Sequence, residues 1–341
     1  MNPEVAPREV GWRAPLFALA AVLFLTSVPP FQLVLPVDRA LLLLAPALAA
    51  CAIAGWRSGG RLGLAIGWTV IAGWILWMAV ARGGSFALLM VGWSVLVTAL
   101  FGAVLMVGWS ERFLPRALLA IGMALAVGAS TALVAGGGSF DSTLALYAEE
   151  TSRRADLLRT AWTEFTSTAQ WAEVVAGTPN AARLTEGMEL QFALLPQMAR
   201  LLLPAMLALE TLMVLALAWA LYHRFGRARL GPPLADWREL TFHDGFVWGV
   251  IAGLVVVVLP VPGFVFAAGM NLLVFTGVLY ALRGLGVMLW FLKPGRWMMV
   301  LWAIVLVLFP HIIGVVAAVL GVGDTWLDWR RRLRPTTQRS E

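Results

Sequence analysis

The chain has 341 residues, of which 60% are hydrophobic and 13% charged, and its mean hydropathy is +0.83. These values exclude an ordinary soluble domain, in which about half of the residues are apolar and about a quarter charged. The net charge of +6 does not indicate nucleic-acid binding, because most arginines lie in short loops between long apolar runs, where the positive-inside rule places them. The single cysteine, Cys51, excludes an intramolecular disulfide and a cysteine-based metal cluster.

The apolar residues are gathered into runs of about 18 or more, the length that crosses a hydrocarbon core of about 30 Å as an α-helix. These runs do not show the alternation of apolar and polar residues that is typical of outer-membrane barrels. The sequence therefore predicts an all-α, polytopic integral membrane bundle of about eight or nine transmembrane helices, with one extramembrane amphipathic segment.

Residues 1–136 are predicted to form about five transmembrane helices. The first run, residues 15–36, follows a signal-like basic start, but it is too long and lacks a convincing cleavage site, so we expect an uncleaved helix. The second run, residues 40–56, holds a lipobox-like sequence that ends at Cys51. Its depth in the chain favours an unmodified cysteine on a small-residue helix face over a lipidated one. The remaining runs cover residues 63–81, 86–108 and 114–135.

Residues 137–193 form the one sizeable polar segment. From Leu144 to Phe165, apolar side chains recur in steps of three and four, with Thr151 filling the one gap, and this pattern predicts an amphipathic helix. Eight acids and four arginines give the segment a charge of −4, against +10 for the rest of the chain. Such a helix lies on the bilayer surface or covers the mouth of the bundle; a solvated connector that folds against its own bundle is the simpler alternative.

Residues 194–322 are predicted to hold about four further transmembrane helices, and residues 323–341 form a basic tail. The predicted spans cover residues 194–222, 246–261, 264–292 and 297–322. With the N-terminus on the cytoplasmic side of the cytoplasmic (inner) membrane, the arginine-rich loops also lie on the cytoplasmic side and the acidic segment lies outside. An odd number of spans then puts the tail outside, against the rule, unless Pro310 splits the last run into a hairpin. The parity stays open at this stage.

Soluble-enzyme signatures such as a Walker A loop or a His-Glu-x-x-His motif are missing. We therefore expect neither an enzyme nor a bound cofactor or metal ion. Asp324 and Asp328 lie four residues apart and are expected to share a helix face. With two tryptophans and three arginines beside them, an interfacial anchor is favoured over a metal–phosphate pair.

Polar groups within the apolar runs are the better clue to function, because an unpaired charge in a membrane is costly and faces a partner or a cavity. Four residues are candidate substrate-binding pocket liners: Glu210, Asn271, Arg283 and His311. Gln32, near the double proline of the first run, belongs with them. Each of these residues is interpreted equally well as structural glue between helices or as the lining of a polar pocket.

The last quarter of the chain carries the only recognisable signature. It consists of Asn271 with Leu279-Tyr280-x-Leu282-x-Gly284, the exit Leu289-Trp290-Phe291-Leu292-Lys293, and the ending Gly-x-x-Asp324-x-x-x-Asp328-aromatic-Arg-Arg-Arg. Over residues 190–334 the chain resembles the YybS-like family of uncharacterised bacterial polytopic membrane proteins, and before that only its hydropathy is similar. Arg283 departs from the glutamine that the family pattern leads us to expect.

This resemblance implies a distant similarity to the S components of energy-coupling-factor transporters, helical bundles that capture vitamins or metal ions. The first hypothesis is therefore a subunit that binds a small solute, with a separate ATPase or coupling module as its partner in the lipid bilayer. The second is a non-transporting scaffold or envelope assembly factor, in which residues 137–193 bind envelope proteins. Fold similarity alone does not decide between them.

Overall fold

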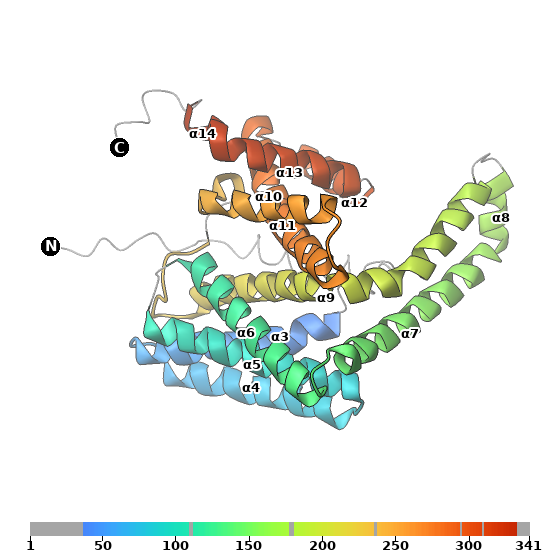
Figure 1. Ribbon diagram of the computed structural model, residues 1–341. Coiled ribbons are helices and arrows are strands. Elements are labelled where there is room, and N and C mark those ends of the chain that lie inside the picture. Colours follow the sequence, from blue (N-terminus) through green and yellow to red (C-terminus); the bar gives the residue numbers. More distant parts are fainter. Residues whose placement is uncertain are drawn as a thin grey trace. The chain divides into compact units, whose positions relative to one another are not determined.

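The computed structural model describes residues 37–108, 112–176, 181–234, 237–293, 295–308 and 310–332 (Figure 1). All regular elements in these ranges are helices, and no strand occurs among them. The predicted all-α class is therefore confirmed for the described part of the chain. The first predicted span, residues 15–36, lies outside it, as do Gln32 and the end of the basic tail.

Six described helices are long and apolar enough to cross a membrane. They are α3 (Val37–Arg57), α4 (Leu62–Ala81), α5 (Ser85–Val107), α6 (Phe113–Ala135), α9 (Ala181–Phe225) and α11 (Gly263–Leu292). The predicted count of eight or nine is not confirmed. The run at 246–261 contains α10 (Val247–Val258), which is only 12 residues long. The last run is divided into α12 (Arg296–Leu308) and α13 (Pro310–Leu327).

The chain divides into two compact units. Among the described residues, the first unit contains those up to Leu201 together with Glu210–Pro233, and the second contains Leu202–Leu209 and those after Pro233. Helix α9 contributes to both units. It also runs without interruption across residue 193, where the change from polar to apolar composition predicted a boundary. That change marks a new environment for the side chains, but it does not end the helix.

In the first unit, α3 packs against α4 and α5 through small side chains. Cys51 is fully buried in the middle of α3. The Ser94 hydroxyl of α5 donates a hydrogen bond of 2.8 Å to the Leu42 carbonyl oxygen. By contrast, α4 exposes Trp74 and Trp77, which suits a face in contact with lipid.

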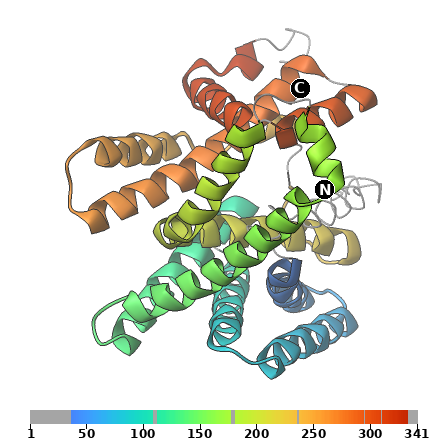
Figure 2. The same cartoon turned by 90° about the vertical axis from the view of Figure 1, so that its right-hand side faces the viewer.

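A long helical hairpin completes the first unit. Helix α7 (Asp141–Thr166) runs outward, α8 (Ala169–Ala176) lies at the far end, and the beginning of α9 returns (Figures 1 and 2). An ion pair of 3.0 Å joins Arg159 of α7 to Glu189 of α9. At the far end Trp162 and Trp171 pack edge-on, with ring centroids 5.4 Å apart. The predicted amphipathic helix is therefore one arm of a hairpin.

The second unit is built on α11. Helix α10 packs against it at Gly253 and Gly269, where an added Cβ atom would collide with the opposite helix. Two short 3-10 helices, η1 (Trp237–Glu239) and η2 (Asp244–Phe246), come before α10 in the chain, and η1 packs against α11. Helix α13 crosses α11 on another side, and this crossing positions the charged residues described next.

Candidate functional site: a buried arginine–aspartate network

Two glycines allow α11 and α13 to touch backbone to backbone. A Cβ atom at Gly284 would overlap the Ala317 carbonyl oxygen, and one at Gly321 would overlap the Tyr280 carbonyl oxygen. Small residues at a helix crossing permit such close approach in a membrane. The crossing brings the residue before Gly284 and the residue three after Gly321 within reach of each other.

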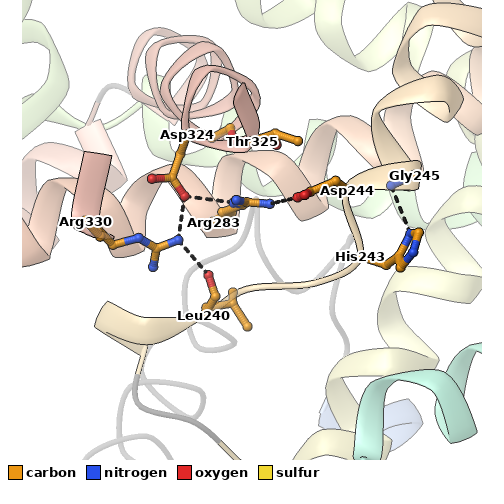
Figure 3. Close-up of polar contacts among 9 residues, drawn as sticks. Leu240, His243, Asp244, Gly245, Arg283, Asp324, Thr325 and Arg330 are labelled. Atoms are coloured by element: carbon orange, nitrogen blue, oxygen red, sulfur yellow. Dashed lines mark hydrogen bonds and ion pairs between the residues drawn. The ribbon is translucent and has the colours of Figure 1, made fainter. Parts of the chain in front are cut away.

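Those two residues are Arg283 and Asp324, and they form the centre of a charged network (Figure 3). Arg283 Nε donates to Asp324 Oδ2 at 3.0 Å, and Arg330 Nη2 donates to the same oxygen at 2.6 Å. The side chains of these residues are only 5%, 1% and 7% exposed, respectively. On the other side, Arg283 Nη1 lies 3.4 Å from Asp244 Oδ1. Asp244 is 69% exposed, so the network reaches the surface at this residue.

The backbone at Asp328 turns Arg330 back toward Asp324. Asp328 has a φ of 43°, in the left-handed region, and α13 ends at the residue before it. Aspartate is one of the few non-glycine residues that adopts this region readily. Helix α14 (Trp329–Arg332) follows, and Arg330 also donates to the carbonyl oxygens of Arg238 at 2.9 Å and Leu240 at 3.2 Å. The turn thus ties the C-terminal helices to the loop before α10.

An aromatic side chain covers the network from the loop. The Arg283 guanidinium lies over the Phe242 ring, 5.5 Å from its centroid, a distance that permits cation–π attraction. Phe242 in turn packs edge-on against the fully buried Tyr280. The guanidinium is therefore enclosed by an aromatic ring and two carboxylates.

The electrostatic balance of the network is uneven. Two buried guanidinium groups share one oxygen of one buried carboxylate, and the second balancing acid, Asp244, is exposed to solvent. The other oxygen, Asp324 Oδ1, is buried and has no hydrogen-bond partner within the described ranges. A buried acceptor without a donor is uncommon in folded proteins. The network can therefore accept one further hydrogen bond at Asp324 Oδ1.

The four candidate pocket liners do not form one site. Arg283 belongs to the network. Asn271, also on α11, has a structural role: its Nδ2 donates to the Ala267 carbonyl oxygen at 2.8 Å, and its Oδ1 accepts from the Ala205 backbone N–H at 2.8 Å. Ala205 follows a proline, which disturbs the hydrogen-bond ladder of α9. Glu210 is half-buried on α9 and belongs to the first unit. His311 lies in α13, and its side chain is outside the described part.

Sequence reasoning missed the partners of Arg283. The expectation that Asp324 and Asp328 share a helix face was wrong, because the left-handed turn at Asp328 ends α13 between them. Asp324 faces Arg283 and Arg330 instead. One signal could have found this network: a single arginine in an apolar helix requires an acid nearby, and the second unit offers Asp244 and Asp324 next to apolar helices.

A bundle of long apolar helices with a buried charge network defines the class of this chain as a multi-pass α-helical membrane protein. Residues 17–325 match the family described as "Predicted membrane protein (DUF2232)", and the chain belongs to that family. The match covers the N-terminal half of the chain as well as the C-terminal half. No curated protein and no solved structure matches the chain.

Proposed function

We propose that the chain is the solute-binding membrane subunit of a small-solute transporter, of the S-component type that its resemblance to YybS-like proteins suggests. One observation supports this proposal above all: Asp324 Oδ1 is buried beside two guanidinium groups and has no donor within the described ranges. Ionisable groups in membrane helices commonly mark solute pathways. An amine, amide or hydroxyl group of a solute is the donor that this oxygen would accept.

In this proposal the solute approaches from the surface at Asp244, the exposed end of the network. Arg283 and Arg330 remain bound to Asp324 Oδ2 and hold its carboxylate in place. The proposal assigns the chain binding and no catalytic step. Energy would come from a separate ATPase or coupling module in the bacterial inner membrane, because the sequence contains no Walker A loop.

Thermal unfolding of the purified chain in lipid nanodiscs tests this function, with a panel of water-soluble vitamins and divalent metal ions as probes. A bound solute at about 100 times its Kd stabilises the folded state by about 2.7 kcal/mol. Asp244→Asn is expected to abolish the shift, and Glu239→Gln, which removes an exposed acid from the same loop, to leave it unchanged. The proposal fails if no probe shifts the unfolding temperature, or if both variants respond like the natural chain.

A second candidate function is that of a membrane scaffold or envelope assembly factor. The hairpin of α7, α8 and the beginning of α9 favours it, because this polar structure continues beyond the apolar helices of its unit (Figure 1). Purification of the tagged chain from native membranes in mild detergent separates the two candidates. A stoichiometric ATPase module supports transport, and co-purifying envelope proteins without an ATPase support the scaffold.

A further inference from the structure

The end of α3, the beginning of α6 and the loop that follows α9 meet at one end of the first unit. Gly55 of α3 lies so close to Tyr222 of α9 that an added Cβ atom would overlap the phenol oxygen. The Tyr222 hydroxyl donates to the Ala228 carbonyl oxygen at 2.9 Å. From α6, Arg116 Nη1 donates to the Leu230 carbonyl oxygen at 2.6 Å. These contacts join segments that are far apart in the sequence.

Side chains of the bundle hold the loop after α9, residues 226–233, by its carbonyl oxygens. In addition to the two bonds just described, Trp219 Nε1 donates to the Pro232 carbonyl oxygen at 3.2 Å. Three carbonyl oxygens of this short loop thus accept hydrogen bonds from α6 and α9. Arg227 and Arg229 of the loop are exposed. The loop therefore presents two arginines on a backbone that is fixed to the bundle.

Further arginines lie on the neighbouring turns. The exposed arginines at this end are Arg57, Arg61, Arg112, Arg227 and Arg229. Arg57 Nη1 lies 3.3 Å from Met106 Sδ, near the end of α5, so α5 reaches the same end of the unit. Residues 55–62, 105–116 and 222–236 contain seven arginines and two acids, a net charge of +5. This end of the first unit is therefore strongly basic.

The basic arginines lie where the apolar helices end. Five of the six candidate membrane spans begin or end here, among them those that end at Arg57 and Phe225 and the one that begins at Phe113. Trp56 and Phe225 are 46% and 42% exposed. Aromatic side chains are enriched where membrane helices meet the lipid headgroups. The arginines are therefore at the depth of the headgroup phosphates.

We propose that this basic end, formed by the five exposed arginines, binds the headgroups of anionic phospholipids in the leaflet that it faces. A guanidinium group donates paired hydrogen bonds to phosphate. Basic clusters beside membrane spans attract anionic lipids, and each arginine adds to the attraction. In the orientation that the arginine loops predict, this leaflet is the cytoplasmic one. An acidic protein segment would have to displace the headgroups that surround the span ends. The proposal depends on neither the transport nor the scaffold function.

Native mass spectrometry tests the proposal on the full chain released from nanodiscs of equal phosphatidylglycerol and phosphatidylcholine content. The lipids that stay bound are expected to be enriched in phosphatidylglycerol at least about threefold. Changing Arg57, Arg61, Arg227 and Arg229 together to glutamine is expected to reduce the enrichment to about 1.5-fold or less. Changing them to lysine is expected to keep most of it, because the charge remains.

The matched control is Arg82→Gln, which removes an exposed arginine from the other end of α4. It is expected to leave the enrichment unchanged. No enrichment in the natural chain overturns the proposal. So does an undiminished enrichment in the glutamine variant, or an equal loss in the Arg82 control.

A single conservative substitution provides a second measurement, which does not depend on the folding of the fourfold variant. Benzoylphenylalanine in place of Phe225, at the end of α9, is photo-activated in native membranes. Lipid adducts richer in anionic phospholipid than the membrane as a whole support the proposal. Adducts that follow the bulk lipid composition, or capture of an acidic protein segment in place of lipid, overturn it.

Discussion

Replacing Asp324 by asparagine tests whether the buried network is held together by charge. The substitution keeps the size of the side chain and removes the one buried carboxylate that two guanidinium groups share. Arg330 retains its two carbonyl acceptors, but the only carboxylate left to Arg283 is the exposed Asp244. Removing one partner of a buried ion pair costs about 3–5 kcal/mol, and we expect Asp324→Asn to lower the free energy of unfolding by that amount.

A double-mutant cycle shows whether the loss comes from the pair. Arg283→Gln alone is also expected to destabilise, but less, because Asp324 keeps Arg330. Combined, the two substitutions are expected to cost about 2 kcal/mol less than the sum of the single effects, within the range for residues in direct contact. The matched control is the exposed pair Arg159 and Glu189, 45% and 44% exposed, whose coupling is expected to be at most about 1 kcal/mol.

The free energies are obtained from reversible unfolding of each variant in mixed detergent micelles titrated with SDS and followed by tryptophan fluorescence. Additive effects at Arg283 and Asp324, or a cost below about 1 kcal/mol for Asp324→Asn, would refute a charge-coupled network. Such a result would mean that the glycine crossing alone holds α11 and α13 together.

Three further predictions concern individual side chains. In the same unfolding assay Gly284→Ala is expected to cost about 1–3 kcal/mol, because the new Cβ atom meets the backbone of α13. The control Gly277→Ala has open space around it and is expected to be neutral or slightly stabilising. Equal effects of the two substitutions would contradict the close crossing. Asn271→Leu is expected to cost about 1–3 kcal/mol, since a backbone N–H of α9 loses its acceptor, and unchanged stability would show that the bond is dispensable. A hydrogen bond from Arg153 holds the pKa of Glu150 below its usual range. This contribution is complete at neutral pH and is lost as the pH falls through the lowered pKa, so Glu150→Gln is expected to reduce the acid sensitivity of folding by less than about 1 kcal/mol, measured as unfolding free energy from pH 7 to 3; an unchanged pH profile would contradict it.

The apolar runs predicted the helices well because lipid leaves the backbone few alternatives to a helix. The ends of the helices were harder to predict. The change to apolar composition at residue 194 suggested a boundary, but hydropathy reports the environment of side chains and not the continuity of the backbone. Similarly, the run from 297 to 322 is uniformly apolar, and only Pro310 indicated that it is two helices.

Of the two residues at the centre of the network, only Arg283 could be found from the sequence. Arg283 was recognisable as a costly charge in an apolar helix, but its partner Asp324 is 41 residues away, and their contact depends on the crossing at Gly284. Glycine pairs are common in membrane helices, so this one could not be distinguished from chance. The left-handed turn at Asp328, which precedes Arg330, has no sequence signature beyond the residue type.

The acidic hairpin also bears on how the chain is inserted into its membrane. The orientation that the arginine loops predict requires residues 137–193, with a net charge of −4, to be carried to the outer side during synthesis. A potential that is negative inside favours outward movement of negative charge by about 2.3 kcal/mol per charge per 100 mV, or roughly 9 kcal/mol for this segment. The excess of acids therefore lets the membrane potential assist translocation of this segment. Dissipating the potential is expected to slow insertion of this chain more than insertion of a variant in which five exposed acids are changed to their amides, namely Glu149, Asp156, Glu164, Glu173 and Glu186.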